Sequence, residues 1–295
     1  MRGSAGRDSC IKTFSGPGRS LGHEACMKTF QIILLAFAMG CSARYGVAQN
    51  APGAGSENDS SDKAKKLIQE AIEALGGPAY LNVRDMQQQG RGYQLHHGQS
   101  SGNGVVFWRF VVFPDKERVE VTKERDVAEL YVGNKGYEIT YKGARQLDEK
   151  DMTDYLRRRK VSLDLVLRQW VNEKGMAFFY EGMGMSGNRP AEQVTLVSAS
   201  NEAVTLLLDP SNHLPIGKKF SWRDPVDKQI NLEEETYDNY RLVGGIATAF
   251  NTSRFFNGDM AGQRFLNSVS YNENPDPAMF DANSGYNPNK AVKKK

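Results

Sequence analysis

The sequence contains little cysteine, and what it has lies near the N-terminus. Cys10, Cys26 and Cys41 are the three cysteines of the 295-residue chain. Residues 42–295 therefore have no thiol with which to form a disulfide bond or a thiolate metal site. A fold made from this part of the chain is held together by packing alone.

Histidine is also scarce, and so are patterns of catalytic residues. Among the four histidines, the one adjacent pair is His96-His97. Their side chains would point to opposite faces of a strand, so they cannot readily share a metal ion. Residues 182–187 match the spacing GxGxxG, but a strand pattern follows where a dinucleotide site needs a helix. We therefore expect no catalytic residues, no metal site and no cofactor, and a protein that is not an enzyme.

A run of apolar residues long enough to span a membrane is missing as well. The longest run, Phe30–Met39, has about ten residues, half of the ~20 that a spanning helix needs. It follows Met27-Lys28, and this combination is typical of a secretory signal peptide that begins at Met27. We therefore expect an exported protein that is periplasmic or associated with the outer membrane.

Two cleavage sites compete at the end of this signal. Residues Gly46-Val47-Ala48 favour ordinary cleavage before Gln49, whereas Ala38-Met39-Gly40-Cys41 resembles a lipobox and would put a lipid anchor on Cys41. The expected division of the chain is a non-native extension plus signal peptide (1–48), a flexible linker (49–61), a folded domain (62–280) and a flexible basic tail (281–295).

The chain carries no strong charge of either sign. Its formal net charge is +3, and removal of residues 1–48, which hold six basic and two acidic side chains, changes this charge to −1. A balanced surface gives no electrostatic reason to expect a nucleic-acid partner.

An amphipathic helix and a series of strands are predicted for the folded domain. Apolar residues recur at helical spacing from Ala64 to Leu75, and Gly76-Gly77-Pro78 ends that pattern. Between Val105 and Tyr271, β-branched and aromatic stretches separated by short turns predict about ten strands. Such short turns favour an antiparallel meander over a parallel sheet with crossover helices. Residues 148–171 interrupt the strands with a second helical pattern.

The most apolar strand, Val105–Phe113, has apolar side chains on both faces. Phe107 and Phe113 lie on one face, and Trp108 and Phe110 lie on the other. A strand with one face in solvent would alternate between polar and apolar residues. Two explanations remain open: the strand is covered by the N-terminal helix outside and the core inside, or its interior is left open for a lipid.

Several strand-and-turn signatures recur along residues 62–280. They are the first helix with Ala74-Leu75-Gly76-Gly77, Pro114 to Glu120, Lys135 to Ile139, Asp209-Pro210 with His213-Leu214-Pro215, and Tyr237 with Tyr240 before Val243-Gly244-Gly245. With these signatures, nearly all of residues 62–280 resembles the bacterial outer-membrane lipoprotein-sorting and lipoprotein-carrier superfamily. The resemblance implies a mainly β fold, a curved antiparallel sheet that forms an incomplete β-barrel with helices packed across its open side. In the carriers the concave face takes up lipoprotein acyl chains, and the helices act as a lid.

Candidate binding residues follow from the apolar strand and from the helical insertion. As the walls of a cavity and its lid we expect Phe107, Trp108, Phe110, Phe113, Leu163, Val166, Leu167, Trp170 and Phe178. Arg157, Arg158 and Arg159 form the strongest charge run, at the end of a predicted helix. They favour either a solvated helix end or a contact with lipid headgroups or an acidic partner.

The function that we expect is the binding of a hydrophobic ligand, a lipid or a lipoprotein acyl chain, in the concave face of the half-barrel by a monomer. The alternative is a sensor or interaction module of the same fold with a filled core and an envelope protein as partner. An empty apolar cavity would favour the first, and a polar, convergent pocket would favour an enzyme instead.

Overall fold

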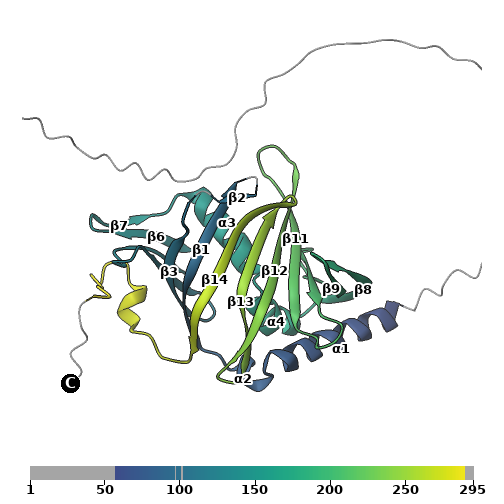
Figure 1. Cartoon of the computed structure of the whole chain (residues 1–295). Helices are drawn as coiled ribbons and strands as arrows, with labels where there is room; N and C mark the ends of the chain where they lie inside the picture. The colour runs from purple at the N-terminus through teal and green to yellow at the C-terminus, as the bar shows by residue number, and fades with distance from the viewer. Residues whose placement is uncertain (1–56, 97, 101, 290–295) are drawn as a thin grey trace, which may run out of the picture. The chain divides into compact units, whose positions relative to one another are not determined.

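A single antiparallel sheet of fourteen strands dominates the chain (Figure 1). The computed structural model describes residues 57–289 apart from 97 and 101. The predicted signal, both cleavage sites and the terminal lysines lie outside the described residues, as does the linker up to residue 56. Among the described helices, none is long and apolar enough to cross a membrane.

The strands and helices have the following bounds. The strands are β1 (Asp85–His96), β2 (Gln99–Ser100), β3 (Val105–Val112), β4 (Lys116–Val121), β5 (Val127–Val132), β6 (Lys135–Thr140), β7 (Gly143–Gln146), β8 (Ala177–Ser186), β9 (Arg189–Val197), β10 (Ala203–Leu208), β11 (Pro215–Arg223), β12 (Ile230–Val243), β13 (Ile246–Phe256) and β14 (Asp259–Tyr271). The helices are α1 (Glu57–Leu75), α2 (Pro78–Leu81), α3 (Glu149–Lys160), α4 (Leu163–Arg168) and the 3-10 turns η1 (Trp170–Asn172) and η2 (Pro277–Phe280).

Two meanders and one bridging strand make up the sheet. Strands β3 to β7 form one meander and β8 to β14 the other, and helices α3 and α4 carry the chain between them. Strand β1 lies between β3 and β14 and joins the two meanders, while β2 pairs with the end of β1. The outer strands β7 and β8 do not pair with each other, so the sheet stays open. The expected incomplete antiparallel barrel with an N-terminal helix and a helical insertion is confirmed.

The central strand β1 was not predicted from the sequence, and neither were β2 and β7. Residues Gln87-Gln88-Gln89 and Arg91 give β1 a polar composition without the alternation that marks a half-buried strand. Nevertheless β1 pairs along its length with β3 and β14. A bulge beside Gly90 brings the carbonyl oxygen of Phe265 to 2.2 Å from where a Cβ atom would lie, so this position requires glycine.

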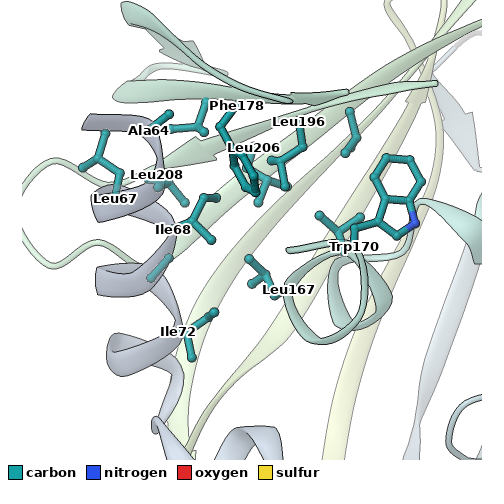
Figure 2. Packing of buried hydrophobic residues seen from close by; sticks show 14 of the residues in the cluster. Ala64, Leu67, Ile68, Ile72, Leu167, Trp170, Phe178, Leu196, Leu206 and Leu208 are labelled. Carbon is teal, nitrogen blue, oxygen red and sulfur yellow. The ribbon is translucent and has the colours of Figure 1, made fainter. Parts of the chain in front are cut away.

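Helix α1 covers the half of the sheet that ends at β8. Its stripe from Ala64 to Leu75 is buried. Figure 2 shows Ile68 and Ile72 on the side of the helix that faces Leu206, Leu196 and Phe178, with Leu167 beside them. Ser60 also exchanges hydrogen bonds with the backbone of Tyr180 in β8. The helix begins at Glu57, so residues 57–61 are helical although we expected them to belong to a linker.

The C-terminal segment covers the outer face of the other half. Met279 and Phe280 of η2 pack with Phe110, Leu130 and the half-buried Trp108. The guanidinium of Arg118 donates to the carbonyl oxygen of Met279 at 3.1 Å. The outer cover of β3 is therefore this segment rather than the N-terminal helix, which corrects the first of the two explanations above.

Residues that we expected to form a tail continue this cover. Ala282 and Tyr286 pack against the same cluster, and the side-chain amide of Asn289 donates to the carbonyl oxygen of Glu124 at 2.7 Å. The tail boundary predicted at residue 281 therefore falls inside a packed segment.

Candidate ligand-binding cavity

A cavity of about 640 Å³ lies on the inner face of the sheet. Its lining comes from β1 to β4, from β12 to β14 and from the loop between β2 and β3. Strands β4 and β12 are five strand spacings apart in the sheet, which is about 24 Å on a flat surface. Because Glu117 of β4 and Glu235 of β12 line the same cavity, the sheet is strongly curved here.

The position of the cavity follows from two glycines in the middle of the sheet. Gly92 of β1 pairs with Val105 on one side and with Arg264 on the other. Gly262 of β14 pairs with Arg254. Directly paired residues share a face of the sheet, so each glycine leaves an empty place beside an inward-pointing arginine.

One wall of the cavity carries a buried ion pair. The Nε of Arg109 donates to Glu117 at 2.6 Å, and the hydroxyl of Tyr155 from α3 donates to the other carboxylate oxygen at 3.2 Å. The ring of Tyr155 stacks on Tyr131 of β5 at 3.6 Å between centroids, so helix α3 is held over this meander. Burial raises the pKa of Glu117, but the attraction of Arg109 outweighs it, and the net pKa lies below its ordinary value.

The opposite wall contains a second network. Lys218 is 2% exposed and donates through Nζ to the carbonyl oxygen of Val161 at 2.9 Å, and the same atom lies 3.4 Å from Glu235. The hydroxyl of Tyr237 donates to Glu235 at 2.7 Å. Burial raises the pKa of Glu235, but Lys218 and Tyr237 outweigh it, and the net pKa is lowered.

Two arginines on the floor of the cavity have no such partner. The guanidinium groups of Arg254 and Arg264 make neither a hydrogen bond nor an ion pair with another described residue, although both side chains are half-buried. Burial lowers the pKa of both groups; repulsion from Arg158 adds to the effect at Arg254, and repulsion from Arg109 adds to it at Arg264.

An apolar wall faces these arginines from β3 and β4. Phe107 projects inward from β3, and Val119 and Val121 project from the neighbouring strand. Val105 lies at the end of this wall and is 53% exposed. The cavity is therefore amphipathic, with cations on its floor and aliphatic and aromatic side chains on one side.

The structure separates the residues that we predicted to form the cavity. Phe107 lines it, whereas Trp108 and Phe110 point to the outer face and pack under the C-terminal segment. Phe113 follows β3 and has the guanidinium of Arg168 at 4.3 Å from its ring centroid. The remaining five lie in or against the core cluster under α1, away from the cavity: Leu163, Val166, Leu167, Trp170 and Phe178.

The three predicted headgroup arginines of α3 are all engaged in ion pairs. Arg158 donates to Glu233 at 2.9 Å, and Arg157 lies 2.7 Å from Asp154 and stacks over the Trp222 ring. Arg159 lies 2.7 Å from Asp164. Arg158 thus ties the end of α3 to β12.

Sequence reasoning missed the three arginines that do face the cavity. Arg109 sits inside the apolar strand β3, and Arg254 precedes Phe255-Phe256 in β13. A charged residue at an inward position of an otherwise apolar strand is the signal that could have pointed to Arg109. Arg254 and Arg264 offer no such signal, because β13 and β14 mix polar and apolar residues.

Solved structures share this architecture. An outer-membrane lipoprotein-sorting protein domain from Vibrio parahaemolyticus superposes with a TM-score of 0.52 at 10% identity, over 75% of this chain and 97% of the other. A DUF1329 family protein from Desulfovibrio piger superposes with a TM-score of 0.53 at 8% identity, over 75% and 97%. The chain has the lipoprotein-sorting fold. No protein-family model and no curated protein sequence match it, so the likeness extends to the fold alone.

Proposed function

We propose that this lipoprotein-sorting fold serves as an exported, non-enzymatic binding protein for a hydrophobic ligand, a lipid or the acyl chain of a lipoprotein. The observation that carries the proposal is the cavity of about 640 Å³ on the inner face, with Phe107, Val119 and Val121 on one wall. Ligand pockets in proteins measure about 300–1,000 Å³, and this cavity falls within that range.

The energetics of an acyl chain suit such a wall. Each buried methylene contributes roughly 0.8 kcal/mol, so a chain with ten methylenes in the cavity gains about 8 kcal/mol before its ordering costs. This gain needs no specific polar contact. The ligand can therefore be selected by its apolar tail, which supports a binder of lipids or acylated proteins.

The half of the sheet under α1 and α4 supports a different use. There the concave side is filled, because Val166 and Leu167 are fully buried and Trp170 is 3% exposed. A filled concavity is the arrangement expected of an interaction module. On the edge strand β8, Met183 and Met185 are 56% and 58% exposed, and flexible methionines are common on protein-binding surfaces. This second candidate function rests on that surface.

The chemistry of the cavity argues against an enzyme. Glu117 and Glu235 are its two carboxylates, and both have lowered pKa values in the folded protein. A general acid or base works best with a pKa near the operating pH, so neither group is suited to proton transfer at neutral pH. Among the described residues no group of His, Cys, Asp and Glu is arranged to hold a metal ion.

A cavity-filling variant tests the proposal. A Cβ atom at Gly92 would meet only a ring carbon of Phe107, at an ordinary 3.9 Å, so Gly92→Leu should fold and place its side chain in the cavity. The control, Asn267→Leu, adds the same side chain at an exposed position of β14.

The readout is titration with a fluorescent fatty acid. We expect saturable binding by the wild type and by Asn267→Leu, and at least a tenfold weaker affinity for Gly92→Leu, which is the effect of losing about two methylene contacts. If the wild type shows no saturable binding at micromolar concentrations, the proposed binding of a hydrophobic ligand is wrong, and the function as an interaction module takes its place.

A further inference from the structure

We propose that Arg254 and Arg264 form a binding site for the anionic head of an amphiphile, a carboxylate or a phosphate, whose tail lies along Phe107, Val119 and Val121. This inference rests on the proposed function and narrows it, because it names the chemical class of the ligand. A ligand with an uncharged head group would not require these two cations.

The strand register brings the two arginines together. Arg264 pairs with Thr252 across β14 and β13, and Arg254 pairs with Gly262 across the same two strands. The two arginines are therefore diagonal neighbours on the inner face, within reach of a common anion for side chains of this length. Two guanidinium groups around one carboxylate or phosphate provide the planar, multidentate donor set that such anions prefer.

The nearby carboxylates are already engaged elsewhere. Glu235 is the direct cross-strand partner of Arg254, yet its carboxylate contacts Lys218 and Tyr237 instead. Glu117 contacts Arg109 at 2.6 Å. The ionised lining therefore retains an excess of positive charge that no described side chain neutralises by direct contact.

The path from this site to the apolar wall is open. Gly92 lies beside Arg264 on the next strand, and Val105 lies one strand further on. Two strand spacings amount to about 10 Å, a distance that the first several methylenes of an extended chain would cover. Since Gly92 has no side chain, a tail that leaves the arginines can cross β1 and reach Phe107.

Unpaired cations in a half-buried place are unfavourable unless a partner neutralises them. Burial lowers the pKa of both arginines, so holding their charges in the cavity has a cost that a bound anion would offset. The same reasoning predicts that Arg264→Met will not unfold the protein, because the substitution removes a charge and breaks no ion pair.

The experiment compares three dodecyl probes that differ in the head group with a free anion that has no tail. Isothermal titration calorimetry at neutral pH measures the affinity of dodecanoic acid, dodecyl phosphate, dodecan-1-ol and inorganic phosphate. The proteins are the wild type, Arg264→Met, Arg254→Met and the control Arg223→Met, which removes an exposed arginine of β11 outside the cavity. Thermal melts verify that each variant is folded, and Arg254→Met provides an independent test if Arg264→Met does not fold.

The expected result is a preference for a charged head that depends on the cavity arginines. The wild type and Arg223→Met should bind the acid or the phosphate about tenfold or more tightly than dodecan-1-ol, as hydrogen bonds to a charged group imply. In Arg264→Met and Arg254→Met this preference should fall while the affinity for dodecan-1-ol stays the same. If dodecanoic acid binds more tightly than dodecyl phosphate, the site prefers a carboxylate head. The opposite order indicates a phosphate head.

Each contrary result has a distinct meaning. Equal affinity of the wild type for all three dodecyl probes overturns this inference and leaves the proposed function intact. Binding of inorganic phosphate without binding of any dodecyl probe overturns both, because the site would then take a free anion. An equal loss of preference in Arg223→Met also overturns the inference, since the effect would reflect the net charge of the protein.

Discussion

Lys218 connects the helical insertion to the sheet, and its replacement gives a sharp test of the buried polar network. Its ammonium donates to the carbonyl oxygen of Val161, between α3 and α4, and lies 3.4 Å from Glu235 on β12. Lys218→Met keeps an unbranched side chain that is one heavy atom shorter and removes the charge. It leaves a buried carbonyl group and a carboxylate without their cation.

The magnitude follows from burial. Removing one partner of a buried ion pair costs about 3–5 kcal/mol. The Glu235 side chain is 24% exposed and keeps its bond from Tyr237, so water from the cavity can partly replace the lost cation. We therefore expect the free energy of unfolding to fall by about 3 kcal/mol, the lower end of this range. For a domain of this size such a loss lowers Tm by about 6–12 °C.

The assay is urea denaturation, with Lys219→Met as the matched control. Lys219 is the next residue of β11, points to the other face of the sheet and donates to Gln193 at 2.9 Å, so its loss should cost about 1 kcal/mol or less. If Lys218→Met is no less stable than Lys219→Met, the ammonium does not hold the insertion to the sheet, and the reasoning is wrong.

The pH dependence of the same variant gives a second check. In the wild type Lys218 keeps the pKa of Glu235 below its ordinary value of 4.5, despite the opposing effect of burial. A lowered folded-state pKa contributes stability that is present above pH 4.5 and lost as the pH falls through the folded value. The stability difference between the wild type and Lys218→Met should therefore be largest at neutral pH and shrink in acid. A difference that stays constant would contradict the assigned ion pair.

Two further predictions concern the core and the absence of cysteine. Trp170→Ala should lower the free energy of unfolding by about 3–5 kcal/mol, because the ring is 3% exposed and its loss leaves a cavity under α1, whereas Tyr141→Ala, at an 86% exposed position, should change it by about 0.5 kcal/mol or less. An equal effect of both substitutions in chemical denaturation would refute the packing assignment. Residues 49–295 contain no cysteine, so added dithiothreitol should not shift Tm in a thermal melt of this part of the chain, and a shift would contradict this view.

Local patterns in the sequence were sufficient to predict most of the elements. The stripe from Ala64 to Leu75 specified helix α1 because a helical period needs no knowledge of what the helix packs on. Short turns specified antiparallel pairing because two neighbouring strands joined by a few residues cannot run parallel. Strand β1 was not predicted because its polar residues show no strand pattern. Its place in the centre of the sheet depends on pairing with β14, which is distant in the sequence.

Which side chains share the cavity depends on contacts between residues that are distant in the sequence. Alternation along Val105–Phe113 established that Phe107 and Trp108 lie on opposite faces, but not which face turns inward or what covers the other. That choice depends on the curvature of the sheet and on the packing of Met279 and Phe280, residues far away in the chain. Arg109, Arg254 and Arg264 converge for the same reason. The local pattern of residues was enough to place each of them on a strand, but the pairing of distant strands brought them around one cavity.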